Sequence, residues 1–141
     1  MTIIKPEKRL FTAFSDFYKL LTEGADHKFN GKAELFVVGL ALGFLHNKRN
    51  NDVKPFEFIR YSHFYDPKSS DHRSIIEMIY ATMADGKDDN AKWQDMLRIA
   101  DGGIEILKQH YNDSGNNIDA SLLIKDVEKI TDGRVSQISG V

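Results

Sequence analysis

Residues 35–45 read LFVVGLALGFL, the most apolar stretch of this 141-residue sequence. Crossing a bilayer takes about 20 such residues, and this run is little more than half that length. Lys32 precedes the run and Arg49 follows it, so charged residues lie near both of its ends. The stretch therefore predicts a helix over about 32–47 that is buried on nearly all sides at the centre of a soluble domain.

Two glycines of this stretch, Gly39 and Gly43, lie four residues apart and share one face of the predicted helix. Each costs about 1 kcal/mol of helix propensity, and close approach of a neighbouring helix is the contact that would offset the loss. Gly102 and Gly103 interrupt a second apolar pattern whose helical phase continues through them, which predicts one helix over about 91–111 with room for a kink. We expect all four to be helix-packing glycines; the alternative is a site that a ligand or a partner backbone approaches.

Working outward, apolar residues at helical spacing predict three further helices, over about 7–22, 72–85 and 120–131. Asp71 and Asn90 are the expected N-caps of the helices that follow them. Residues 56–65 read FEFIRYSHFY, and this aromatic, roughly alternating pattern fits either a short strand or an irregular loop.

These elements predict a mainly α fold, a single compact domain of about five helices with an aromatic loop or short strand between helices 2 and 3. The domain is expected to span 1–133, and the small, polar residues 134–141 are expected to fray. The first ten residues, MTIIKPEKRL, lack the basic start, apolar run and cleavage site of a secretory signal. A cytoplasmic location without membrane contact is therefore expected.

The composition narrows the function classes. The sequence has 19 Lys+Arg against 21 Asp+Glu, a formal charge of -2, so it lacks the global positive field that attracts nucleic acid. It has no cysteine, which excludes disulfides, thiolate zinc sites, iron–sulfur clusters on thiolates and thiol nucleophiles. The phosphate-loop, dinucleotide, nucleophile-elbow and zinc-protease motifs do not occur in it. We expect no cofactor and no catalytic residues.

One group of histidines and carboxylates is a candidate metal site: His63, Asp66, Asp71 and His72. Two imidazoles and two carboxylates could surround a divalent cation. Their spacing matches no zinc template, however, and Asp71 is already the expected helix cap. Hydrogen-bonded or solvated polar groups are the simpler interpretation, and solvation likewise explains the pair Asp88 and Asp89.

Basic and aromatic residues are interleaved over positions 46–73, a composition that resembles a nucleic-acid surface. Asp52 and Glu57 dilute its charge. This segment is the predicted surface for a protein partner or for nucleic acid, and its candidate residues are Lys48, Arg49, Lys54, Arg60, Tyr61 and Arg73.

Three stretches together resemble a known family. They are residues 28–44 (KFNGKAELFVVGLALGF) with HNKR shortly after, residues 59–66 (IRYSHFYD) and residues 100–108 (ADGGIEILK). In this order and spacing they resemble the small DNA phosphorothioation-associated proteins, the Dnd-system-associated family of type four, from about Lys5 to Asp126. Asp101 stands where the family pattern leads us to expect asparagine.

The resemblance implies a prokaryotic defence protein encoded beside enzymes that put sulfur into the DNA backbone or restrict unmodified DNA. The family offers no catalytic residues to transfer, so it implies a non-catalytic accessory subunit that contacts a larger ATPase, nuclease or sulfur-transfer protein. Without a thiol, this chain could not carry the sulfur itself. The alternative function is a small DNA-binding protein that uses residues 46–73, and self-association is compatible with either.

Overall fold

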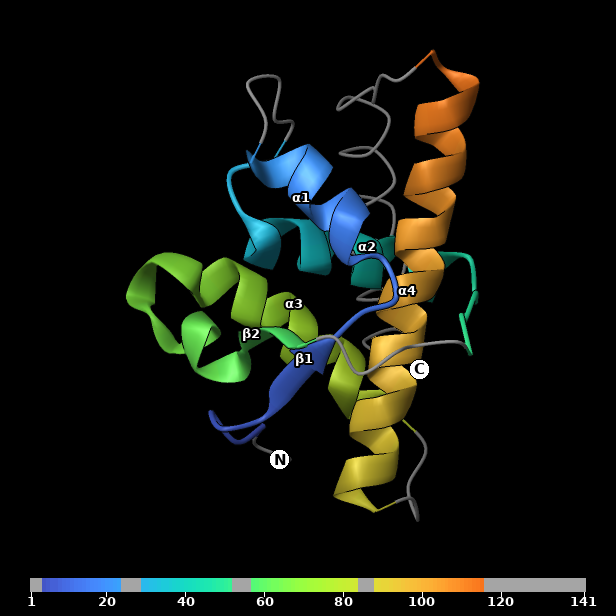
Figure 1. The fold of residues 1–141 in the computed structure, drawn as a ribbon. Coiled ribbons are helices and arrows are strands. Elements are labelled where there is room, and N and C mark those ends of the chain that lie inside the picture. Colours follow the sequence, from blue (N-terminus) through green and yellow to red (C-terminus); the bar gives the residue numbers. More distant parts are fainter. Residues whose placement is uncertain (1–3, 24–28, 52–56, 84–87, 116–141) are drawn as a thin grey trace.

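The helix built on the apolar stretch, α2 (Lys32–Leu45), packs against α4 (Asp89–Asp113), which runs the length of the molecule (Figure 1). The structure is a computed structural model and describes residues 4–23, 29–51, 57–83 and 88–115. In these ranges a two-stranded sheet, α1 (Ser15–Glu23) and α3 (Ser70–Ala81) accompany the α2–α4 pair. The prediction of a mainly α single domain is confirmed.

Glycine allows the backbones of α2 and α4 to touch. A β-carbon at Gly103 would overlap the carbonyl oxygen of Gly39, and one at Gly43 would overlap the carbonyl oxygen of Ile99. Gly39, Gly43 and Gly103 therefore lie where the two helices meet, as the sequence leads us to expect. Gly102 instead faces the chain that leaves α2, because a β-carbon there would overlap the carbonyl oxygen of Lys48.

The prediction of one helix over 7–22 is wrong for its first part. Residues Arg9–Phe11 form strand β1, which pairs antiparallel with β2 (Glu57–Arg60), and the helix α1 begins only at Ser15. Leu10 lies opposite Ile59 and is fully buried. Its burial within the sheet outweighs the local helical spacing of the apolar residues, because tertiary packing overrides weak local preference.

The aromatic segment contains both a strand and helical turns. After β2, two short 3-10 helices follow, η1 (Tyr61–Tyr65) and η2 (Pro67–Ser69). Strand β2 and η1 are tied to the N-terminal segment, since the amide of Tyr61 donates to the carbonyl of Lys8 at 2.8 Å. The 56–65 pattern therefore resolves, from Glu57 on, into a strand and an aromatic turn.

The helix starts differ from the expected caps. Asp71 lies in the first turn of α3, which begins at Ser70 and ends at Ala81, four residues before the predicted end. Asp88, not Asn90, caps α4: its side chain accepts a hydrogen bond from the amide of Ala91 at 2.7 Å. At α4 an aspartate two positions before Asn90 takes over the cap, and at α3 the cap position falls on Ser69, whose side chain makes no capping hydrogen bond. Shifts of one or two residues leave the helices themselves unchanged.

The central core is aromatic, and Trp93 of α4 lies in it. Its ring meets that of Tyr61 edge-on at 5.8 Å, and its indole nitrogen donates to the carbonyl of Arg9 at 2.9 Å. Trp93 thus joins α4 to η1 and to β1.

Some predictions lie outside the described residues: the helix at 120–131, the tail at 134–141 and the side chain of Lys54. In the part of the chain that is described, no helix combines the length and the apolar composition that crossing a membrane requires.

Candidate functional site

The candidate basic residues do not form one surface. Lys48 and Arg49 follow α2 on one side of the molecule, whereas Arg60 and Arg73 belong to β2 and α3 on the other side (Figure 1). The turn that ends α2 sets the position of Lys48 and Arg49. Asn47 takes the left-handed conformation (φ 50°), and the amide of Lys48 donates back to the carbonyl of Gly43 at 2.9 Å, closing a Schellman turn.

Lys48 and Arg49 are both paired with carboxylates of α4. Lys48 Nζ lies 3.6 Å from Glu105. Arg49 donates from Nε and Nη2 to the two oxygens of Asp95, at 2.8 and 3.3 Å. The hydrogen bond that Arg49 donates to Asp95 raises the pKa of Arg49, in keeping with a bidentate pair. These two residues hold the chain after α2 on α4.

Arg60 is paired within the sheet, since its Nε lies 3.4 Å from Glu57, a carboxylate that Arg9 also approaches at 3.7 Å. Tyr61, predicted as part of the surface, is fully buried. Its ring fills the core beside Trp93, which corrects its expected role. Burial raises the pKa of the Tyr61 hydroxyl, and the negative charge of Glu77 adds to the rise.

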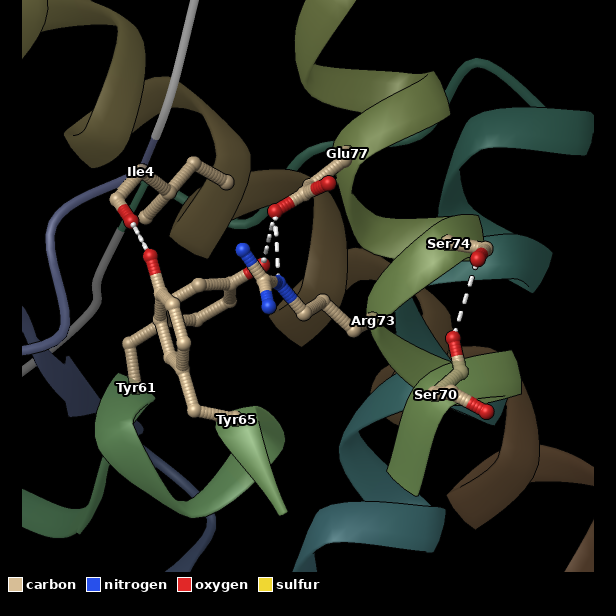
Figure 2. Close-up of polar contacts among 7 residues, drawn as sticks. All are labelled: Ile4, Tyr61, Tyr65, Ser70, Arg73, Ser74 and Glu77. Atoms are coloured by element: carbon tan, nitrogen blue, oxygen red, sulfur yellow. Dashed lines mark hydrogen bonds and ion pairs between the residues drawn. The ribbon is translucent and has the colours of Figure 1, made fainter. Parts of the chain in front are cut away.

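Arg73 is held on several sides (Figure 2). Its Nε donates to Glu77 at 2.8 Å, one turn along α3, and its guanidinium carbon lies 3.7 Å from the centre of the Tyr65 ring. The Tyr65 hydroxyl donates to the carbonyl of Ile4 at 2.6 Å, and the same oxygen of Glu77 accepts from Tyr61 at 3.3 Å. The hydrogen bond to Glu77 raises the pKa of Arg73. The side chain is thus oriented by a charge pair and by a stacked ring.

A surface depression of about 280 Å³ lies beside this side chain. We call it the Arg73 hollow. It is lined from η1 and the turn after it by Phe64, Tyr65, Asp66 and Pro67, and from α3 by Ser70, Arg73, Ser74 and Glu77.

The Arg73 hollow has the chemistry of a binding site. The Ser74 hydroxyl donates to the carbonyl of Ser70 at 2.9 Å, the ordinary contact of a helical serine and not that of an activated nucleophile. The lining holds one guanidinium, Arg73, whose planar fork suits a carboxylate, and two carboxylates, Asp66 and Glu77.

The histidines and carboxylates considered as a metal site are not gathered. Among the described residues no three His, Asp or Glu side chains are placed to hold a metal ion. Asp66 instead accepts from the amide of Lys68 at 2.9 Å and so caps η2. Asp89, expected to be a solvated charge, accepts from the hydroxyl of Tyr80 at 2.7 Å.

Sequence reasoning missed the role of Asp101, which is 1% exposed. One carboxylate oxygen accepts from the Thr12 hydroxyl at 2.6 Å and the other from the amide of Ala13 at 2.8 Å, so Asp101 anchors the turn between β1 and α1 on α4. Burial raises the pKa of Asp101, and the two hydrogen bonds oppose that rise. The Tyr18 hydroxyl is buried without a hydrogen-bond partner among the described residues, and burial together with Asp101 raises its pKa. The sequence does carry one sign of this role, because Asp101 is an acidic residue within the apolar stripe of a helix.

Comparisons with protein-family models, with curated proteins and with solved structures give no match to this chain.

Proposed function

We propose that this chain is a non-catalytic accessory subunit that contacts a larger protein of a prokaryotic, DNA phosphorothioation-linked defence system. The sequence resemblance supports the system. Its three stretches supply α2, the β2–η1 segment and the middle of α4. The resemblance therefore involves the elements that build the core, and it supports a shared fold as the basis of a shared role.

One observation favours a protein partner over DNA: the candidate basic side chains that the structure describes are paired with carboxylates. The pairs are Lys48 with Glu105, Arg49 with Asp95, Arg60 with Glu57 and Arg73 with Glu77. DNA binding draws its affinity from many cations that neutralise successive phosphates, and a carboxylate beside each of these cations lowers the positive potential that such a track needs. A surface of mixed, paired charge is better suited to a protein interface, where such pairs set specificity.

Affinity purification tests the proposal. The tagged chain is expressed at its native level together with its neighbouring genes, and the recovered proteins are identified and quantified by mass spectrometry. We expect a larger subunit of the system in near-stoichiometric amount. Recovery of the tagged chain alone, from cells in which the neighbouring proteins are detected, would contradict the accessory role.

A mobility-shift assay tests the alternative of direct DNA binding. We expect no shift on either plain or sulfur-modified duplex at physiological salt. If DNA binding is the function, a shift will appear, will weaken steeply between about 50 and 200 mM salt and will be lost when Lys48 and Arg49 are both changed to Glu. Circular dichroism of that double variant checks that it remains folded, because Asp95 loses its partner.

A further inference from the structure

We infer that the Arg73 hollow binds a carboxylate side chain, presented by an acidic segment of the partner protein. This inference rests on the proposed function, because it names the chemistry by which the partner is recognised.

The first argument is the orientation of Arg73. Glu77 accepts from Nε at 2.8 Å and the Tyr65 ring stacks on the guanidinium at 3.7 Å. Within the described residues neither terminal nitrogen, Nη1 nor Nη2, makes a hydrogen bond to the protein. These two nitrogens form a fork that matches the two oxygens of a carboxylate. Since the fork is already held, little side-chain entropy is lost when an anion binds.

The second argument is the shape of the hollow. A volume of about 280 Å³ has room for one entering side chain, whereas a nucleic-acid backbone needs an extended groove. Tyr65 and Pro67 offer apolar surface for the methylene groups of the entering side chain, and the Ser70 hydroxyl is a further donor at the α3 side.

The third argument concerns charge. Two carboxylates, Asp66 and Glu77, lie in the same lining as Arg73. Glu77 is compensated by Arg73 at 2.8 Å, and Asp66 is an exposed cap of η2. One cation and two carboxylates give the lining a net charge of -1, so the affinity for a carboxylate comes from the directed hydrogen bonds of the Arg73 fork, and Asp66 opposes a phosphate dianion or a polyanion more strongly than a single carboxylate. It follows that removing the charge of Asp66 should strengthen carboxylate binding.

Nuclear magnetic resonance of the full chain gives a direct test. The probes are three blocked pentapeptides, Gly-Ala-Xaa-Leu-Gly, in which Xaa is Glu, Gln or Lys. Only the Glu peptide is expected to shift the Nε–H signal of Arg73 and the amide signals of Ser70 and Ser74. Absence of a Glu-specific shift at millimolar peptide overturns the inference.

Three variants distinguish carboxylate binding at the hollow from cation binding. Arg73→Lys keeps the charge and removes the fork, and it should weaken the Glu peptide about tenfold. Asp66→Asn should tighten binding of the Glu peptide, while Arg98→Lys, on α4 and outside the hollow lining, should leave it unchanged. If the Lys peptide binds and Asp66→Asn weakens it, the hollow accepts cations and the inference is wrong. If inorganic phosphate shifts the same signals at lower concentration than the Glu peptide, the acidic peptide is the wrong ligand class.

The affinity purification separates this inference from the proposed function. Capture of a partner by the wild-type chain and its loss in Arg73→Lys, but not in Arg98→Lys, supports both. Equal capture by all three proteins keeps the accessory role and overturns the hollow as its docking point. Capture by none of them contradicts the accessory role, and the peptide titration then decides on the hollow alone.

Discussion

At the scale of single residues, Asp101 is unusual because it is a buried carboxylate. It accepts two hydrogen bonds, and no cation among the described residues is paired with it. Its raised pKa means that burial disfavours the ionised form more than the hydrogen bonds favour it. Asparagine could accept from the Ala13 amide, but its own amide group would then have to donate to the Thr12 hydroxyl oxygen, which already accepts from the amide of Phe14. The carboxylate accepts from both groups of the β1–α1 turn without this rearrangement, but it buries a charge.

The titration of Asp101 gives a prediction with a definite sign. A carboxyl whose folded pKa is raised destabilises the fold once it ionises, so stability falls as the pH rises from its ordinary pKa, about 4, through the raised value. We expect Asp101→Asn to lack this fall: its free energy of unfolding, relative to wild type, should increase as the pH is raised from about 4 to 7. Urea denaturation at a series of pH values measures this difference.

A second variant keeps the Asp101 carboxyl and changes its pKa. The Thr12 hydroxyl lowers the Asp101 pKa, so Thr12→Val should raise that pKa further. Its stability deficit should then grow with pH, on top of a loss of about 1–3 kcal/mol from the missing hydrogen bond. Parallel pH profiles for wild type and both variants would show that Asp101 does not titrate as described.

At the scale of elements, the contact of α2 with α4 depends on backbone touching backbone. A β-carbon at Gly103 overlaps the rigid backbone of Gly39, whereas one at Gly39 lies 2.7 Å from the end of the Ile104 side chain, which can rotate, and 3.0 Å from the carbonyl oxygen of Ala100. The two glycines are therefore not equivalent, although the sequence gives them the same spacing argument. Overpacking against backbone requires the helices to separate.

The expected ranking of glycine variants follows. Gly103→Ala should lower the free energy of unfolding by about 3 kcal/mol or more, and Gly39→Ala by less. Gly31→Ala is the matched control, since a β-carbon there has nothing within 4 Å, and it should cost less than about 1 kcal/mol. Thermal and urea denaturation of the three variants tests the order. Equal losses at Gly103 and Gly31 would rule out the backbone contact.

The elements differ in how well the sequence predicts them. The α2 and α4 helices follow from long apolar patterns, and the phase kept through Gly102 and Gly103 correctly indicates a single helix. Strand β1 could not be predicted, because Leu10 is buried by pairing with a segment about 50 residues away. The Arg73 hollow could be predicted only in part: Arg73 and Tyr65 stand out by type, but their stacking depends on how η1 turns toward α3.

At the scale of the whole molecule, Trp93 connects the sheet, the aromatic turn and α4. It is the only tryptophan of the chain, and it is 3% exposed. Its contacts with Tyr61 and with the carbonyl of Arg9 mean that loss of any one of the three parts changes its surroundings.

We therefore expect cooperative unfolding with a single transition. Tryptophan fluorescence and far-ultraviolet circular dichroism should give the same urea midpoint, because the sheet is too small to be stable apart from the helices. A fluorescence transition at clearly lower urea would mean that β1, β2 and η1 detach as a separate unit.

The position of β1 has a consequence for how the chain is made. Synthesis releases the N-terminal end first, yet the partners of residues 9–13 come much later: β2 and η1 at 57–61, the Trp93 ring and the Asp101 carboxylate. The strand β1 therefore cannot pair until β2 has been made, and its contacts with α4 form later still, so Leu10 and Phe11 are uncovered in the meantime. During that interval the nascent protein exposes an unpaired apolar strand, the surface on which chaperones act.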